Sequence, residues 1–176
     1  IKQCQQLPIQ FSLDDFGTGY STLVQLKRMA ANEIKYDDEF QLMILSENAS
    51  VEDPTRGIFG DEMTIQYADS LLEMIHVDKN AFAYNDLNLK INKDGPYQKF
   101  RDEMTSKELI AHFQEENISQ LKLIKMATTL YHVVDDSLLA GENSVSGDTI
   151  RISFQEGEIK RLQVQGGALG EFNPEG

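Results

Sequence analysis

Two adjacent aspartates, Asp14 and Asp15, follow an alternating segment of the chain and precede two glycines, Gly17 and Gly19. Adjacent carboxylates at the carboxyl end of a strand can hold divalent metal ions, which activate water and neutralise a phosphodiester. A lysine on the next strand can orient that water or stabilise charge, and Lys35 lies in the next strand candidate along the chain. Metal-dependent phosphodiester hydrolysis is therefore the first chemistry to consider.

Residues 13–23 (LDDFGTGYSTL) and 33–37 (EIKYD) closely resemble a segment of EAL domains, which are barrel-fold phosphodiesterases that hydrolyse cyclic di-GMP. By this resemblance Asp14 would be a metal ligand, Asp15 would lie at the metal site, and Lys35 would be the catalytic lysine. The metal would be Mg²⁺ or Mn²⁺, and cyclic di-GMP would be the ligand. Apart from this site, no cofactor is expected.

The resemblance leaves most of the EAL metal site outside the chain. It covers about residues 5–58, a minor part of the family's domain, and lacks the glutamate of the Glu-Ala-Leu signature and the other metal ligands. One aspartate pair cannot fill a two-metal site, so hydrolysis by this chain alone is not expected, and the enzyme question stays open. The alternative is a relic segment in which Asp14 and Asp15 are exposed in a loop.

The elements that would position this motif alternate between strand and helix. Residues 9–13 alternate like a strand, residues 21–31 have helical spacing, residues 33–36 form a short strand candidate, and residues 38–45 form a second helix candidate. This order is about a quarter of a parallel barrel, or part of another α/β sheet. The hydrophobic period changes near residue 60, which we take as a domain boundary.

After this boundary the hydrophobic period is two. Ile150, Ile152 and Phe154 alternate with polar residues, the chain turns at Glu156-Gly157, and the alternation then resumes, which predicts a β-hairpin. A similar unit begins 41 residues earlier at Phe113, and the tetrapeptide at 61–64 (DEMT) recurs 41 residues later at 102–105. A repeated hairpin unit predicts stacked hairpins that cover one another's apolar faces. Chance similarity among amphipathic hairpins is the alternative.

Residues 61–176 resemble an OstA-like repeat, the unit that builds the β-jellyroll of lipopolysaccharide transport proteins. The ordered matches include residues 133–143 (VVDDSLLAGEN), 154–162 (FQEGEIKRL) and 166–170 (GGALG). This resemblance implies a lengthwise apolar groove for the acyl chains of lipid A. It also implies jellyrolls that join end to end through open sheet edges, and a periplasmic location.

The side chains that would line such a groove alternate along the predicted hairpins. A continuous apolar trough suits acyl chains. The candidates are Ile110, Phe113, Leu121, Leu123, Ile150, Ile152, Phe154, Leu162 and Val164. The same residues could instead fill a closed sandwich core, and alternation does not distinguish a groove from a core.

The composition excludes several classes of protein. The 176 residues include 16 basic and 29 acidic ones, a net charge of −13, so a nucleic-acid backbone or an anionic membrane surface would be repelled. Cys4 is the sole cysteine, which excludes an internal disulfide and a cysteine zinc cluster. No stretch approaches the roughly 18 apolar residues of a transmembrane segment. His76, His112 and His132 lack the spacing of metal ligands and are expected to be ordinary strand residues.

These patterns predict an α+β fold, with a βαβα piece at residues 1–58 and a mainly antiparallel, jellyroll-like module at residues 61–176. The first functional hypothesis is a non-enzymatic, periplasmic module that handles lipopolysaccharide or lipid A, or assembles the envelope, with other jellyroll proteins as partners. The second is a cytoplasmic cyclic di-GMP phosphodiesterase fragment or binder. The third is a chimeric or artificial fusion without native function, because the two resemblances belong to different compartments.

Overall fold

The computed structural model describes residues 9–12, 28–37, 39–68, 71–115, 117–135, 137–155 and 158–174, and its regular elements are all β-strands. In these residues no helix occurs, so the predicted α+β class with a βαβα piece is wrong. In chain order the strands are β1 (Ile9–Ser12), β2 (Arg28–Ala31), β3 (Glu33–Asp37), β4 (Leu42–Glu52), β5 (Arg56–Ala68), β6 (Leu71–Lys90), β7 (Tyr97–Gln114), β8 (Asn117–Asp135), β9 (Leu138–Gln155), β10 (Glu158–Gln165) and β11 (Leu169–Pro174).

The corrections fall in the first third of the chain. The end of the first predicted helix is strand β2, which pairs antiparallel with β1, while residues 13–27 lie outside the described residues. The second predicted helix is a turn at residues 39–41 followed by β4. Strand pairing prevails there because Leu45 is fully buried opposite Met63, a contact between distant residues that local spacing does not reveal.

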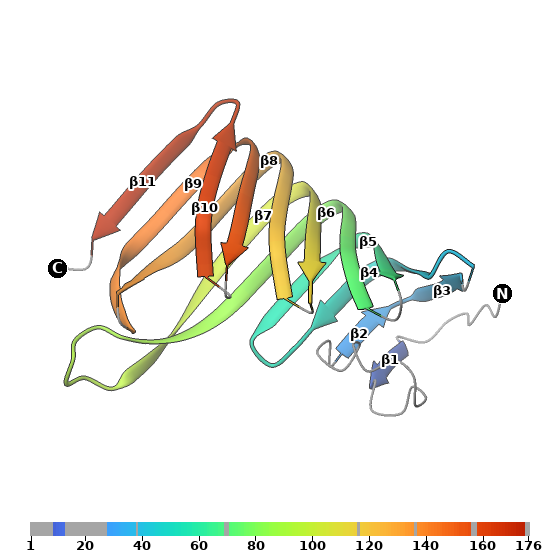
Figure 1. Ribbon diagram of the computed structural model, residues 1–176, viewed down its shortest axis with the longest axis horizontal. Coiled ribbons are helices and arrows are strands. Elements are labelled where there is room, and N and C mark those ends of the chain that lie inside the picture. Colours follow the sequence, from blue (N-terminus) through green and yellow to red (C-terminus); the bar gives the residue numbers. More distant parts are fainter. Residues whose placement is uncertain are drawn as a thin grey trace.

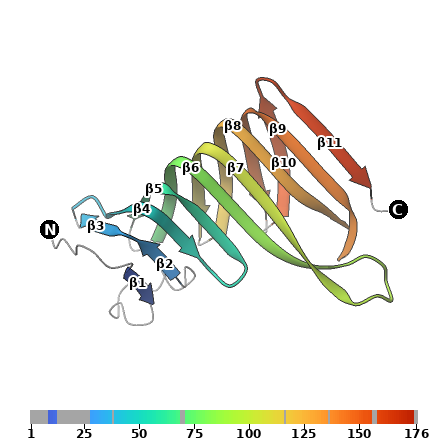
Figure 2. The same ribbon diagram turned by 180° about the vertical axis from the view of Figure 1, so that it is seen from behind.

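The strands form one 11-stranded sheet in the order β1-β2-β4-β5-β6-β7-β8-β9-β10, with β3 beside β4 and β11 beside β9. Its ladders are antiparallel except for a parallel bridge between Lys90 and Leu138. Figure 1 shows the sheet folded over on itself like an inverted V, and Figure 2 shows it from behind. The two halves, which we call the short arm and the long arm, are joined by strands that pass through both. The short arm contains β3, β10 and residues 42–46, 62–68, 71–78, 108–115, 117–124 and 149–155. The long arm contains β2, β11 and residues 49–60, 81–105, 127–135 and 138–147.

A line of bulges, which we call the fold line, separates the two arms. The ladder registers shift along this line in every pair from β4–β5 to β8–β9. Left-handed backbone angles occur in consecutive pairs at the same places, and they bend the strands sharply. The pairs are Glu47 and Asn48 in β4, Lys79 and Asn80 in β6, and Lys125 and Met126 in β8.

Small residues stand on the intervening strands where they cross the fold line. They are Gly60 in β5, Ser106 in β7 and Gly147 in β9. A Cβ atom at Gly60 would collide with Val77, and one at Gly147 would collide with Val164. The bends therefore bring neighbouring strands so close together that little or no side chain fits at these positions.

The hydrophobic core lies between the arms beside the fold line. Burial of aliphatic side chains such as these stabilises a fold by roughly 1.5–3 kcal/mol each. One row crosses the short arm in register and is fully buried: Leu45, Met63, Val77, Leu109, Leu123 and Ile150. The next row contains Ile65, Ile75, Ala111, Leu121 and Ile152, and the long arm contributes Val51, Ala83, Met104 and Val145 to the same cluster.

The predicted hairpins are confirmed in the second half of the chain. Strands β9 and β10 pair Ile150 with Val164 and Ile152 with Leu162, on either side of the predicted turn. Strands β7 and β8 form the equivalent hairpin 41 residues earlier, with its ends at residues 114 and 117 instead of 155 and 158. The recurring tetrapeptide is not structurally equivalent, because Met63 pairs with Val77 in the short arm whereas Met104 pairs with Ala83 in the long arm.

The predicted boundary near residue 60 lies within strand β5. This strand runs from Arg56 to Ala68 and pairs with β4 on both sides of that point. The sheet is thus continuous across the boundary, while the division into segments 1–58 and 61–176 stays a prediction about independent folding.

Candidate functional site

A groove of about 940 Å³ lies between the two arms, on the side away from the fold line. It begins where the closed core ends, because the arms diverge from each other with distance from the bends (Figure 1). A mostly apolar cleft of this size is typical of sites for small apolar ligands. The apolar lining from the short arm is Leu72, Ile75, Phe113, Ile118, Leu121, Phe154, Ile159 and Leu162; that from the long arm is Val51, Ile58, Ala83, Leu87, Leu89, Met104, Val133 and Val134.

The structure separates the nine predicted groove residues into three sets. Phe113, Leu121, Phe154 and Leu162 line the groove. Leu123, Ile150 and Ile152 are fully buried in the core beside the fold line, and Val164 packs against that core. Ile110 belongs to the outer face, because it pairs with His76 and Lys122 in a row that alternates with the buried one. A core and a groove are therefore both present: the inward-facing residues near the fold line form the core, and those farther from it line the groove.

Of the three residues predicted by resemblance to EAL domains, the structure describes only Lys35. Asp14 and Asp15 lie outside the described residues. Lys35 lies on β3, where its ammonium is 3.2 Å from a carboxylate oxygen of Glu33 and its side chain is 48% exposed. It lies on the outer face, since its neighbour Ile34 pairs with the buried Leu45. Among the described residues, no group of three or more His, Cys, Asp or Glu side chains could hold a metal ion.

The long arm differs from the short arm by a row of polar residues along its inner face. In register, this row joins Arg56 to Asn85 and Asn85 to Asp102. It continues beyond the end of the β7–β8 pairing with Tyr131 opposite Asn143 on β8 and β9. The amide of Asn143 donates to the Tyr131 hydroxyl at 2.6 Å. The groove is consequently amphipathic: its short-arm wall is apolar apart from Lys160 and Arg161 on β10, and its long-arm wall contains a polar band.

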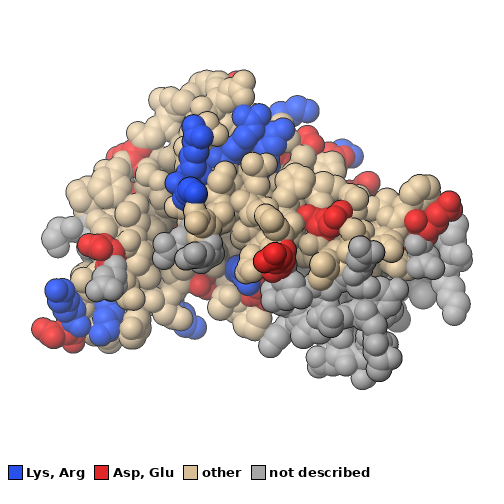
Figure 3. All heavy atoms as spheres, viewed as in Figure 1, with Lys and Arg blue, Asp and Glu red and all other residues tan. Residues whose placement is uncertain are grey.

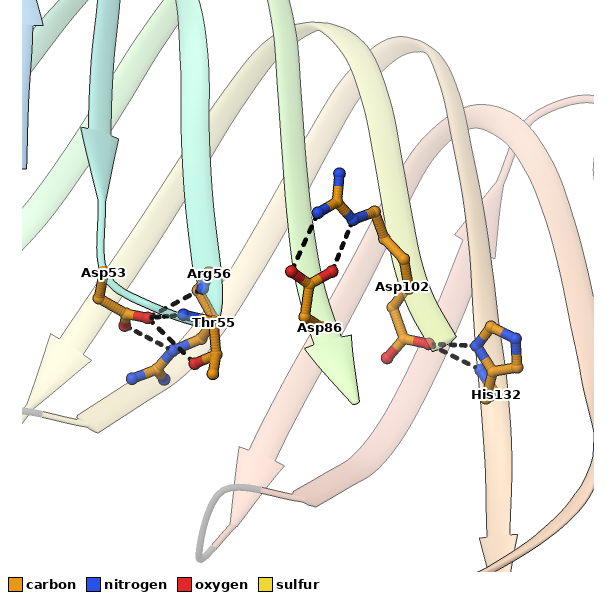
Figure 4. A network of polar contacts seen from close by, with 7 residues as sticks. Asp53, Thr55, Arg56, Asp86, Asp102 and His132 are labelled. Atoms are coloured by element: carbon orange, nitrogen blue, oxygen red, sulfur yellow. Dashed lines mark hydrogen bonds and ion pairs between the residues drawn. The ribbon is translucent and has the colours of Figure 1, made fainter. Parts of the chain in front are cut away.

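The most buried polar contact of this band joins Asp102 to His132 (Figure 4). One carboxylate oxygen of Asp102 accepts a hydrogen bond from the backbone N–H of His132 at 2.8 Å and lies 2.9 Å from its Nδ1. Both side chains are about nine-tenths buried, at 10% and 8% exposure. The pairing of β7 with β8 ends at Glu103, so the Asp102 carboxylate replaces the missing backbone acceptor where the two strands separate.

A second polar contact of the band holds the turn between β4 and β5 (Figure 4). Asp53 Oδ1 accepts hydrogen bonds from the backbone N–H groups of Thr55 and Arg56, both at 2.8 Å, and Oδ2 lies 2.9 Å from Arg56 Nε. Burial alone would raise the pKa of the Asp53 carboxyl. The hydrogen bonds from Thr55 and the charge of Arg56 outweigh this effect, so the pKa is lowered.

On the outer face of the long arm, Arg101 joins two strands and covers an aromatic cluster. Its guanidinium donates to both carboxylate oxygens of Asp86, at 2.6 and 2.9 Å (Figure 4). The same guanidinium lies 4.1 Å from the Tyr84 ring centre. The hydrogen bond from Arg101 lowers the pKa of Asp86. Phe59 and Phe82 stand beside Tyr84 with ring centres 5.9 to 6.3 Å apart. Sequence reasoning missed these contacts because the partners are on different strands and form no recognisable motif.

The fold is that of a β-jellyroll-like sheet with a groove between its halves, and a solved structure supports this description. The structure of LptH from Pseudomonas aeruginosa, described as the LptA-homologous periplasmic component of the conserved lipopolysaccharide transport device, superposes with a TM-score of 0.55. It is 14% identical in sequence, and the match covers 79% of this chain and 81% of LptH. The resemblance to OstA-like jellyrolls is thus confirmed as a resemblance of fold. No family model matches the chain.

The resemblance to EAL-containing proteins is also confirmed, over a short stretch. A match of 40 residues is 48% identical to the bifunctional diguanylate cyclase/cyclic di-GMP phosphodiesterase MucR of Pseudomonas aeruginosa. A match of 40 residues is 55% identical to the cyclic di-GMP phosphodiesterase PdeR of Escherichia coli. Each covers 23% of this chain and only 6% of the curated relative. The described residues contain no helix long and apolar enough to cross a membrane.

Proposed function

We propose that the chain is a non-enzymatic lipid-handling module that holds the acyl chains of lipopolysaccharide or lipid A in the groove between its arms. The observation that carries this proposal is the groove of about 940 Å³ with an apolar short-arm wall. The fold shared with a periplasmic component of a lipopolysaccharide transport device adds support and favours a periplasmic location. Apolar chains inside such a groove would remove apolar surface from water on both walls.

The experiment measures binding of lipid A to the full-length chain through displacement of a fluorescent fatty-acyl probe. Leu162→Gln places a polar amide in the groove wall at a partly buried position, and we expect it to weaken lipid A binding by about tenfold or more. Ile110→Gln is the matched control, because Ile110 is equally intermediate in burial but lies on the outer face. Equal affinity of the wild type and Leu162→Gln would reject the groove as the lipid site.

The partners we propose are other jellyroll proteins, which would pair with the open edges of the sheet. Strand β11 ends one side of the sheet and is exposed along its whole length, with Leu169 at 73% and Phe172 at 51% exposure. Exposed strand edges with apolar side chains are ready templates for pairing with another chain. Edge pairing would extend the groove from one protein into the next.

A second candidate function rests on the two matches of 40 residues to cyclic di-GMP enzymes. In this alternative the segment around Asp14, Asp15 and Lys35 binds cyclic di-GMP with Mg²⁺ or Mn²⁺. Titration calorimetry of the full chain with cyclic di-GMP in the presence of either metal tests it, with Asp14→Ala as the variant that should lose the signal. A wild-type titration without heat would exclude this candidate. The comparisons lend no support to a chimeric origin.

A further inference from the structure

Basic residues collect on the outer face of the short arm although the chain as a whole is strongly acidic. The segments of β8, β9 and β10 in this arm, residues 117–124, 149–155 and 158–165, contain four cations and a single carboxylate, Glu158. The whole chain has the opposite balance, with 16 basic and 29 acidic residues. Figure 3 shows lysine and arginine side chains gathered on the upper part of this face.

Three of these cations form one contiguous group, which we call the basic band: Lys122, Arg151 and Arg161. Lys122 and Arg151 stand directly opposite each other on β8 and β9. Arg161 on β10 pairs with Ser153, two residues from Arg151 on the same face. Like charges that face each other across a ladder destabilise a sheet, so an anion bound between them would relieve this repulsion.

No ion pair among the described side chains reaches the basic band. In the described part of the chain, the ion pairs within 4.0 Å include none with Lys122, Arg151 or Arg161. The side chain of Arg151 is 3.4 Å from the amide oxygen of Gln165, a neutral group. By contrast, Lys35 and Arg101, also on the outer surface, are paired with Glu33 and Asp86.

The basic band also meets the groove. Arg161 is part of the groove lining, together with its neighbours Lys160 and Leu162 on β10. Leu162 faces the apolar interior, whereas Arg161 belongs to the outer row that contains Ser153. An amphiphile whose chains lie along Leu162 and Phe154 would therefore bring its polar end beside Arg161, and the band continues from there over the outer face.

We propose that Lys122, Arg151 and Arg161 bind the phosphate-bearing headgroup of an amphiphile whose acyl chains occupy the groove. The proposal rests on the proposed function and adds the ligand's charge to it: the groove selects anionic amphiphiles over neutral ones with the same chains. Arginine pairs phosphate with two parallel hydrogen bonds, and Lys122 adds a further positive charge.

The test compares dodecyl phosphate with dodecyl maltoside, both below their micellar concentrations, for binding to the full chain. We expect the wild type to prefer dodecyl phosphate by about tenfold or more, because a charge-assisted hydrogen bond contributes more than a neutral one. The double variant Arg151→Gln/Arg161→Gln should lose this preference while its affinity for dodecyl maltoside stays unchanged. The preference should also decline with added salt.

The control variant, Lys79→Gln/Lys99→Gln, removes the same number of charges from exposed sites outside the band. It should keep the preference for dodecyl phosphate. If both double variants lose this preference equally, the net charge of the protein and not the basic band is its cause. Inorganic phosphate alone should bind far more weakly than dodecyl phosphate; equal affinity would mean a free-anion site and would overturn the headgroup proposal. Equal wild-type affinity for both amphiphiles overturns only the headgroup proposal. If neither amphiphile binds, the groove function is overturned as well.

Discussion

At the scale of single residues, Thr129 stands out in the core. It is 2% exposed, occupies the buried long-arm row between Met104 and Val145, and its hydroxyl has no hydrogen-bond partner among the described residues. Burial of an unpaired hydroxyl is unfavourable, so we expect Thr129→Val to raise the free energy of unfolding by about 1 kcal/mol. Chemical denaturation measures the change. Thr128→Val is the control, because that exposed hydroxyl lies 2.6 Å from the Thr105 hydroxyl; the expectation fails if both variants lose stability equally.

Asp53 gives the fold a pH-dependent contribution. Its folded-state pKa is lowered, so the stabilisation is complete above the unfolded-state pKa near 3.8 and is lost as the pH falls through the folded-state value. We expect Asp53→Ala to lower stability at pH 7 by about 1 kcal/mol, because the turn between β4 and β5 loses its acceptor. Melting temperatures of both proteins should converge as the pH falls below 3.8 and the Asp53 carboxylate becomes protonated in the folded state. A constant difference across this range would contradict the proposed role of the charge.

At the scale of the strand, the fold line depends on residues in an unfavourable backbone conformation. Met126 has φ of 54° and is 73% exposed, so its side chain gains little contact in return for the strain. Asparagine occupies the equivalent second position at Asn48 and Asn80 and tolerates this conformation better. We therefore expect Met126→Asn to stabilise the protein by about 0.5–1 kcal/mol. Met126→Ala should bring no such gain in thermal unfolding, and equal effects would show that strain is not the cause.

The strands show which local signals in the sequence were sufficient to predict secondary structure. The hairpin of β9 and β10 could be predicted because its alternation and its turn are local, and the pairing of Ile152 with Leu162 follows from them. The segment that forms β4 was misread as a helix because its four consecutive apolar residues, Leu42 to Leu45, fit both periods. The fold line was not predictable, because Lys79, Lys125 and Met126 are ordinary residues that adopt left-handed angles only under the constraint of the sheet.

The groove was predictable only in part, because alternation is a local signal whereas the position of the bends is not. Alternation distinguishes the two faces of β8 to β10, but it carries no information about how far a side chain lies from the fold line. Leu121 in the groove and Leu123 in the closed core differ only in their distance from the bend at Lys125 and Met126. Asp102 and His132 could not be paired from sequence, since 30 residues separate them and their contact depends on where β7 leaves β8.

At the scale of the whole molecule, the open edge at β11 predicts association. If edge pairing brings jellyrolls together, the wild type should self-associate with rising concentration in sedimentation velocity. The double variant Leu169→Lys/Phe172→Lys should remain monomeric, because charge on an edge strand opposes pairing. Tyr97→Lys is the control, since Tyr97 is 61% exposed at the start of β7 and away from that edge. Association that persists in the Leu169→Lys/Phe172→Lys variant would show that another surface is responsible.

The fold line also determines the mechanics of the groove. Each strand from β4 to β9 crosses from one arm to the other, so the angle between the arms is fixed jointly by the bends in all of these strands. Widening the groove at one point would require neighbouring bends to open together, while the ladders hold them in register. The sheet therefore acts as a stiff clamp with a nearly constant gap, in which ligands of different length can lie along the axis more readily than ligands of different thickness.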